Sequence, residues 1–389
     1  MSKPLSPHAF PHALPSNVEL IEGSIVRCSI TAFAPTHAQL IRHNGGVHAV
    51  EWNARDHRKQ RYRTVSPRRG HTRHVKGFWP KFIHLFRIEY WNISWWVGMM
   101  FTAGSIVWVI NGFQVFLPFV SSVPTAPAKS GWSAFVGATI FAFASILLVI
   151  EAWNRDDSAL FGYALKESLK DSISGVRSNH DNGFHPGSET EKRPEDTKLQ
   201  NWTWFSTDPK YFHEIGFMAA FTQWCAATIF WISGFAGIVQ LNTALMKHTA
   251  SLVGVFWVPQ IIGGSGFIIS STLYMLEAQR KWYIPAPLSL GWHSGFWNLI
   301  GGIGFAACGA FGISTRHWAQ YQSTLCTFWG SWAFLIGSLI QWYEAVSPIR
   351  GKEQDEEKGK GREDDTSSNS RDGGNENRND TTDGQPPKA

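Results

Sequence analysis

The chain has 389 residues, a net charge of +5 and a mean hydropathy of -0.16, which on average is that of a soluble protein. The average conceals an uneven distribution, because each of several long stretches lacks Asp, Glu, Lys and Arg. These stretches are 90–128, 130–150, 215–246, 248–276, 282–315 and 317–343. Each can cross a bilayer core of about 30 Å, which needs roughly 20 apolar residues. The sequence therefore excludes a soluble globular protein and predicts an all-α fold, a polytopic membrane bundle of six transmembrane helices.

The spans group into three tandem two-helix hairpins separated by polar segments. We expect a basic N-terminal region at 1–90, hairpins at 91–150, 214–277 and 278–346, a polar loop at 151–213 and a tail at 347–389. The tail and the middle of the loop lack the apolar residues needed to offset chain entropy, so we expect disorder there. Short apolar runs such as VELIEGSIV predict a few strands within residues 18–50.

Lys and Arg are concentrated on one side of the predicted membrane. Residues 1–90 contain 14 Lys and Arg against 5 Asp and Glu. The short loops expected on the other side contain one basic residue each, namely Lys129, Lys247 and Arg316. Because Lys and Arg near span ends resist translocation, we expect both termini and the long loop to be cytoplasmic. The plasma membrane and the membranes of the secretory pathway both fit this arrangement.

The basic residues from Arg55 to Arg87 have two interpretations. They bind anionic lipids of the cytoplasmic leaflet, at about 1 kcal/mol for each well-placed charge, or they do no more than fix the topology of the first span. No nucleic-acid-binding motif accompanies the charge, so we expect no nucleic-acid partner. The sequence does not determine the oligomeric state.

Spans two, four and six share the pattern G-x3-F-x3-S-x5-E-A, which occurs three times without gaps. Spans one, three and five align more weakly, through Gly112, Gly234 and Gly309, each with an aromatic residue four positions earlier. Positions four apart share one helix face, so the pattern indicates a packing stripe where small residues allow close approach; pore lining is the alternative. The stripe residues are Gly137, Phe141, Ser145, Gly263, Phe267, Ser271, Gly330, Phe334 and Ser338.

Each copy of the pattern ends in a glutamate followed by alanine: Glu151, Glu277 and Glu344. A carboxylate at a helix C-terminus faces the negative end of the helix dipole, at a cost of about 0.3–1 kcal/mol, so each needs a compensating partner. An Arg follows each glutamate within six positions, and the first two are within reach if the helices continue. These residues are Arg155, Arg280 and Arg350.

The three glutamates have two interpretations. In the simpler one they mark the span ends at the level of the lipid headgroups, in salt bridges with the arginines that follow. In the other they converge as a cytoplasmic gate or cation site, because ionisable groups near the membrane interior often mark such paths. Gln223 and Asn298 lie deeper, at equivalent positions of two copies. We expect them to form inter-helix hydrogen bonds of roughly 1 kcal/mol, with substrate contact as the alternative.

No span contains Asp, and neither a G-x-S-x-G motif nor a phosphate-binding loop occurs, so we expect no catalytic residues. No Cys or His spacing typical of a metal site is present, and we expect no metal and no other cofactor. The sequence favours a structural or organising membrane protein that binds anionic lipid. The alternative is a channel or facilitator for a small solute, with the three glutamates at its cytoplasmic mouth.

Three two-span copies invite comparison with mitochondrial carriers, but the odd-numbered spans lack the kinked proline, acid and base motif of that family. The segments LSLGWHSGFWNLIGGIGFAACGAFG and TFWGSWAFLIGSLIQWYEAV resemble a group of uncharacterised fungal multi-pass integral membrane proteins. The resemblance covers the spans and not the tails. That group has no established activity, so the resemblance implies a membrane protein and assigns no site.

Overall fold

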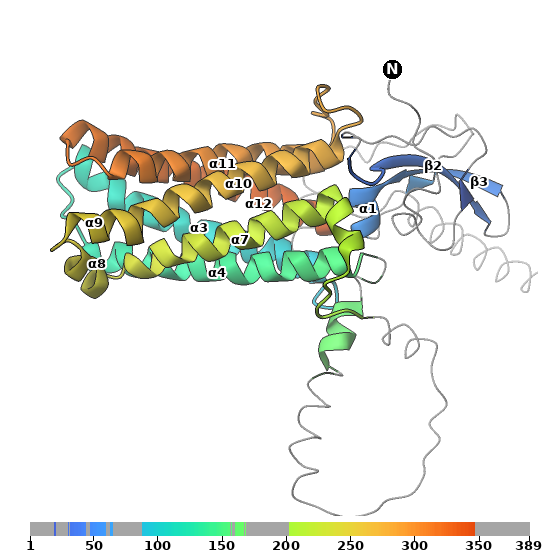
Figure 1. Ribbon diagram of the computed structural model, residues 1–389, viewed down its shortest axis with the longest axis horizontal. Coiled ribbons are helices and arrows are strands. Elements are labelled where there is room, and N and C mark those ends of the chain that lie inside the picture. Colours follow the sequence, from blue (N-terminus) through green and yellow to red (C-terminus); the bar gives the residue numbers. More distant parts are fainter. Residues whose placement is uncertain are drawn as a thin grey trace, which may run out of the picture. The chain divides into compact units, whose positions relative to one another are not determined.

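The computed structural model describes residues 19–20, 30, 32–43, 47–59, 63–64, 88–155, 157, 160–166, 168 and 202–346. Within these residues, six helices are long and apolar enough to cross a membrane, and Figure 1 shows them lying side by side. This confirms the predicted polytopic helical bundle. The helices are α3 (Ile93–Val120), α4 (Pro127–Trp153), α7 (Ile215–Ala236), α10 (Val258–Ala278), α11 (Leu290–Gly312) and α12 (His317–Val346).

Local sequence explains where several helices begin and end. The Asn92 side chain caps α3 by accepting a hydrogen bond from the Ser94 amide, and Pro127 occupies the first turn of α4, where its missing N–H costs nothing. The uncharged stretch 215–246 holds two helices, because α7 ends before Gly237 and the chain continues as α8 (Val239–Leu245). The fourth candidate span, Thr249–Ala278, combines three consecutive segments. These are α9 (Thr249–Leu252), a π-helical turn at Val253–Trp257, and α10.

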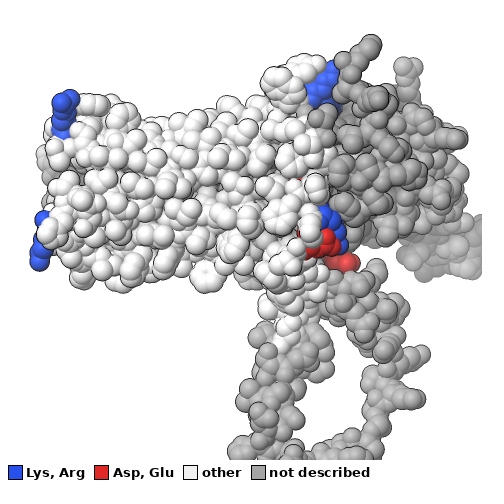
Figure 2. All heavy atoms as spheres, viewed as in Figure 1, with Lys and Arg blue, Asp and Glu red and all other residues white. Residues whose placement is uncertain are grey.

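The six long helices form a closed ring. Each packs mainly against two neighbours, in the order α3, α4, α7, α10, α11, α12 and back to α3. Figure 2 shows that the middle of the visible face carries no Lys, Arg, Asp or Glu, and that charged residues lie toward its two ends. An uncharged middle between charged ends is the surface expected of a bundle embedded in lipid.

Aromatic rings fill the centre of the helix ring. One layer comes from α4, α10 and α12, where the ring centroids of Phe141, Phe267 and Phe334 lie 5.6, 5.8 and 6.5 Å from one another. All three side chains are at most 3% exposed. Their edge-to-face geometry is the favoured arrangement for aromatic pairs. The three hairpins therefore meet around a common axis at this level.

A second aromatic layer comes from α3, α7 and α11. The centroids of Trp108, Phe230 and Phe305 lie 4.8, 5.4 and 5.5 Å from one another. Each of these residues packs against the stripe glycine of the other helix in its own hairpin, at a position where a Cβ atom would be crowded. The pairs are Gly137 with Trp108, Gly263 with Phe230 and Gly330 with Phe305.

A small antiparallel sheet precedes the bundle, with strands in the order β1 (Glu19–Leu20), β2 (His37–His43), β3 (Val47–Asn53) and β4 (Arg63–Thr64). Strands therefore occur in the N-terminal region, as its short apolar runs predict. β2 and β3 pair along their whole length. The short helix α1 (Ala54–Arg58) follows β3 directly and lies at one end of the bundle (Figure 1). The tail and most of the 151–213 loop lie outside the described residues, so their disorder stays a prediction.

Candidate functional site

Helix α1 directs three cationic side chains toward the bundle. Its first turn is fixed by Asn53, whose side-chain oxygen accepts a hydrogen bond from the Arg55 amide at 2.8 Å. Arg55, Arg58 and Lys59 are spaced three and four residues apart and therefore lie on one face of the turn. They are only 5%, 6% and 4% exposed. Such burial of cations requires nearby carboxylates, because an unpaired charge in a protein interior is strongly unfavourable.

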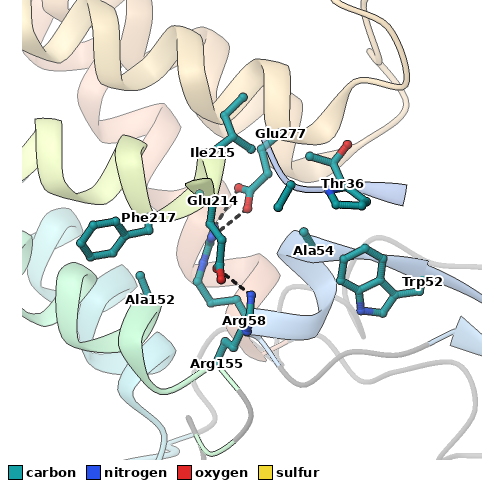
Figure 3. A pocket seen from close by; sticks show the side chains of 13 residues that line it. Thr36, Trp52, Ala54, Arg58, Ala152, Arg155, Glu214, Ile215, Phe217 and Glu277 are labelled. Carbon is teal, nitrogen blue, oxygen red and sulfur yellow. Dashed lines mark hydrogen bonds and ion pairs between the residues drawn. The ribbon is translucent and has the colours of Figure 1, made fainter. Parts of the chain in front are cut away.

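Glu277 at the end of α10 supplies the first carboxylate. Arg58 donates from Nη1 to Glu277 Oε1 at 2.7 Å and from Nη2 to Oε2 at 2.9 Å. Figure 3 shows this pairing between α1 and the end of α10. The parallel two-bond geometry matches the planar guanidinium to the planar carboxylate, and it is the strongest form of charge-assisted hydrogen bond.

Glu344 at the end of α12 supplies the second carboxylate. Arg55 donates from Nε to Glu344 Oε1 at 2.9 Å and from Nη2 to Oε2 at 2.7 Å. Arg55 Nη1 also lies 3.9 Å from Glu277 Oε2, so one guanidinium contacts the ends of two spans. The Lys59 amine lies 3.6 Å from Glu344 Oε2 but forms no hydrogen bond with any described residue.

Glu151 in the last turn of α4 has a different partner. Its Oε1 accepts a hydrogen bond from the Ser94 hydroxyl of α3. Glu151 is 1% exposed, and in the described part of the chain no Lys or Arg lies within ion-pair distance of it. Its charge nevertheless acts on Arg58 and Lys59 through space.

Glycines create the space that the two guanidinium groups occupy. Ser94, Gly216 and Gly291 each lie 18 residues before the glycine that aligns the odd-numbered spans. A Cβ atom at Gly216 would overlap the guanidinium of Arg58, and one at Gly291 would overlap that of Arg55. At this position the first hairpin has a serine, whose hydroxyl donates to Glu151. The other two hairpins have a glycine, and an arginine side chain of α1 occupies the space beside it.

Tyr274 of α10 completes the surroundings of the arginines. The guanidinium carbons of Arg55 and Arg58 lie 5.6 and 5.8 Å from the centroid of its ring. Both distances are within the range of cation–π attraction. The arginines thus contact carboxylates and an aromatic face in the same site.

The pKa values of the three cations separate the arginines from the lysine. Burial alone would lower the pKa of Arg55 and Arg58, but the carboxylates of Glu344 and Glu277 outweigh it and raise both pKa values above the ordinary range. Burial lowers the pKa of the Lys59 amine, and the surrounding carboxylates offset this only in part. The arginines are therefore well compensated at this site, and the lysine is not.

A further ion pair, between Arg155 and Glu214, borders the cluster. Glu214, one residue before α7, accepts a hydrogen bond at its Oε2 from Arg155 Nη1 at 2.6 Å, as Figure 3 shows. Its Oε1 is buried and has no hydrogen-bond partner among the described residues. Burial raises the pKa of Glu214 to about 7, although Arg155 opposes the shift. A cavity of about 20 Å³ lies between this pair, Arg58 and Glu277, which is room for one water molecule.

The arginines that follow the glutamates in sequence are not the partners that we expected. Arg155 pairs with Glu214. Helix α10 ends at Ala278, and the extended Gln279 carries Arg280 out of helical reach of Glu277. Arginines of α1, far away in sequence, compensate Glu277 and Glu344 instead, and the Ser94 hydroxyl binds Glu151.

Two further predictions concern basic residues. Arg350, expected near Glu344, lies outside the described residues, so its pairing stays a prediction. Arg55 and Arg58, at the start of the basic stretch expected to bind lipid, are buried in ion pairs and are not available to a lipid surface. Any lipid contact is therefore left to the basic residues from Arg61 to Arg87.

The nine stripe residues are all buried inside the bundle. The serines contribute small size more than bonds between helices, because the Ser145 hydroxyl donates to the carbonyl of Phe141 on its own helix. The Ser338 hydroxyl is within hydrogen-bond distance of the Leu335 carbonyl on its own helix, at 3.0 Å, and of the Ser105 hydroxyl of α3, at 3.4 Å, so it also links two helices. Gly, rather than Ser, provides the close helix contacts.

Gln223 and Asn298 are not brought together by a hydrogen bond. Neither side chain forms one with a residue in the described part of the chain, although Asn298 of α11 packs against Gly337 of α12. Inter-helix bonding is instead provided by Gln260 of α10, which accepts from the Ser233 hydroxyl and donates to the Cys308 sulfur at 2.9 Å.

No family model matches the chain, and no curated protein or solved structure is significantly similar to it. The resemblance to the fungal membrane proteins stays an expectation. What can be said of this site therefore rests on its own geometry.

Proposed function

We propose that this protein is a non-catalytic structural component of a membrane, whose bundle holds an N-terminal sheet and helix in place at its cytoplasmic face. The observation that supports this best is the pair of two-bond ion pairs, Arg58 with Glu277 and Arg55 with Glu344. They join residues 219 and 289 positions apart in the sequence. Removing one partner of such a buried pair is strongly destabilising, so the contact fixes the orientation of α1 on the bundle.

The alternative of a channel or facilitator has less support. Its cytoplasmic mouth would be formed by Glu151, Glu277 and Glu344, and two of these are occupied by arginines of the same chain. Two layers of aromatic rings also fill the centre of the bundle in this conformation. A conducting path along the axis would require these rings to separate.

We further propose that the remaining basic residues, Arg61 to Arg87, contact anionic lipid. Docking of α1 at the bundle end would carry the following chain close to the membrane surface. Each well-placed Lys or Arg at an anionic surface contributes about 1 kcal/mol. This attraction would support the same structural role, because it adds a second attachment of the N-terminal region.

Hydrogen–deuterium exchange of the full chain in lipid nanodiscs tests the structural role. We expect the amides of residues 54–59 to exchange slowly in the wild type and rapidly in the Glu277→Gln/Glu344→Gln variant. In proteoliposomes, neither protein should transport small cations. Fast exchange of α1 in the wild type would contradict the proposed attachment. Cation uptake that depends on the glutamates would favour the channel instead.

A further inference from the structure

The acceptors and donors of the charge cluster come from different parts of the molecule. The acceptors Glu151, Glu277 and Glu344 end the equivalent helix of each hairpin. The cationic donors to Glu277 and Glu344 come from a single turn outside the bundle, α1 and the residue after it, whereas Glu151 accepts from Ser94 of α3. The bundle end is therefore a site with its own geometry, and α1 is one occupant of it.

The site is shaped for guanidinium groups. The missing side chains at Gly216 and Gly291 leave the volumes that Arg58 and Arg55 fill, and the Tyr274 ring lies beside both. Glu277 and Glu344 each accept hydrogen bonds at both oxygens from one planar guanidinium fork, which an ammonium group cannot provide. These features select the chemical type of the ligand as well as its charge.

Lys59 shows how poorly the site accepts an ammonium group. Its amine is buried and directed at the cluster, yet it stays 3.6 Å from Glu344 Oε2 and forms no hydrogen bond with a described residue. In the first hairpin, Ser94 stands at the position of the glycines in the other two, and its hydroxyl binds Glu151 in place of a third guanidinium. The site thus has two guanidinium positions.

We propose that the bundle end is a recognition site for an Arg-x-x-Arg peptide segment, with Arg55 and Arg58 of α1 as its built-in ligand. The proposal rests on the docking of α1 put forward above and adds the class of ligand. A segment of another protein that presents two arginines on one helical turn would compete with α1 for the two carboxylates. Displacement of α1 would release the N-terminal module from the bundle.

The test uses the full chain in nanodiscs, with the site emptied by Arg55→Gln/Arg58→Gln. A fluorescent peptide with the sequence of residues 52–59, WNARDHRK, serves as the probe, and anisotropy reports its binding. We expect the emptied variant to bind the peptide at least about tenfold more tightly than the wild type, a difference of about 1.4 kcal/mol. Adding Glu277→Gln/Glu344→Gln should abolish binding.

Two controls separate recognition from simple charge attraction. A peptide with Lys in place of both arginines should bind at least about tenfold more weakly, and spermine should not displace the arginine peptide. If the emptied variant does not fold, Arg55→Lys/Arg58→Lys retains the charges and should still bind the arginine peptide better than the wild type does. Equal binding of the lysine peptide, or no gain over the wild type, would overturn the proposal. Hydrogen–deuterium exchange of residues 54–59 separates the two proposals. No gain over a wild type whose α1 exchanges slowly overturns peptide recognition, whereas rapid exchange of α1 in the wild type overturns the docking itself.

Discussion

Glu277 and Arg58 are almost completely buried, and this distinguishes their ion pair from one at the surface. Their side chains are 1% and 7% exposed, whereas those of Asp208 and Lys210, which also form an ion pair, are 44% and 41% exposed. Water screens the exposed pair and leaves it worth about 0–1 kcal/mol. Loss of one partner of a buried pair leaves an uncompensated charge and costs about 3–5 kcal/mol.

We therefore expect Glu277→Gln to lower the free energy of unfolding by about 3 kcal/mol or more, and Asp208→Asn to lower it by less than about 1 kcal/mol. Denaturant unfolding of the detergent-solubilised protein measures both. The double variant Arg58→Met/Glu277→Leu should recover part of the loss, since it buries no charge. Equal effects of the two single substitutions would show that the buried pair adds nothing to stability.

Glu214 predicts a dependence of stability on pH. Burial raises its pKa from 4.5 in an ordinary environment to about 7 in the folded protein, so the folded state binds a proton more tightly than the unfolded state. Its contribution to stability is complete below about pH 4.5 and is lost as the pH rises through about 7. Between about pH 5 and about pH 8, we expect the melting temperature to fall less for Glu214→Gln than for the wild type, because the glutamine does not titrate. Parallel curves for the two proteins would rule out this role for Glu214.

At the scale of elements, the contact of α1 with the bundle depends on what is missing from α7 and α11. A Cβ at Gly216 or Gly291 would overlap the arginine side chains. The glycines lie in the first turns of their helices, where alanine is otherwise well accommodated. Their role is thus to leave space for a neighbouring element.

We expect Gly216→Ala/Gly291→Ala to displace α1 while leaving the six-helix bundle folded. Protection of the amides at 54–59 should fall at least about tenfold, corresponding to about 1.4 kcal/mol of lost docking energy. Gly254→Ala is the matched control, because no atom lies within 4 Å of the Cβ position there. Unchanged protection in the double variant would mean that α1 adjusts without leaving the site.

Helix α4 allows the stability contribution of a side chain packed inside the bundle to be compared with that of a side chain on its outer surface. Phe141 is 3% exposed within the aromatic layer, and Phe143, two residues further along, is 58% exposed on the outside of the bundle. Lipid tails fill the space left by a truncated outer side chain, but a cavity remains inside.

Phe141→Ala should therefore lower the free energy of unfolding by about 3–5 kcal/mol, and Phe143→Ala by less than about 1 kcal/mol. Unfolding of both variants in mixed lipid and detergent micelles provides the measurement. A large loss for Phe143→Ala would indicate that the outer face of α4 is itself covered, for example by a second copy of the chain.

The elements could be predicted from the sequence because the signals are local. Uncharged stretches locate the six spans, and the shared glutamate-alanine ends indicate equivalent helices. The end of α7 was missed, since the uncharged stretch continues through α8 and Gly237 alone interrupts it. The partners of the glutamates were missed for a different reason: Arg55 and Glu344 are 289 residues apart, and local spacing cannot report such a contact. One signal was available, because Gly216 and Gly291 stand where the first hairpin has Ser94.

For the whole molecule, the charge cluster and the aromatic layers place polar and apolar interactions at different depths. The carboxylates lie in the last turns of α4, α10 and α12. The first aromatic layer lies ten residues earlier on the same helices, and the second lies on α3, α7 and α11. The hairpins are joined to one another by packing and to the N-terminal module by charge. We therefore expect the bundle to stay folded when α1 leaves it, as competition by a peptide requires.

The same placement of charge predicts an orientation for the molecule in its membrane. The basic N-terminal region and the loop before α7 should both be cytoplasmic, and the turn between α3 and α4 should face the other side. Ser122 in that turn and Thr207 in the loop are both exposed, so Ser122→Cys and Thr207→Cys report on the two sides. We expect a membrane-impermeant maleimide to label Thr207→Cys, and not Ser122→Cys, in sealed vesicles with their cytoplasmic side outward.

The labelling uses a Cys28→Ser background, because Cys28 belongs to the N-terminal region and its thiol would react on the side that Thr207→Cys reports. Cys308 and Cys326 are buried and Cys225 lies within a span, so these three cysteines are retained. Permeabilised vesicles should show labelling of both variants, which demonstrates that each cysteine is reactive. The reverse pattern would place the N-terminal module and the arginines of α1 on the non-cytoplasmic side. It would also exclude cytosolic Arg-x-x-Arg segments as competitors, because they could not reach Glu277 and Glu344.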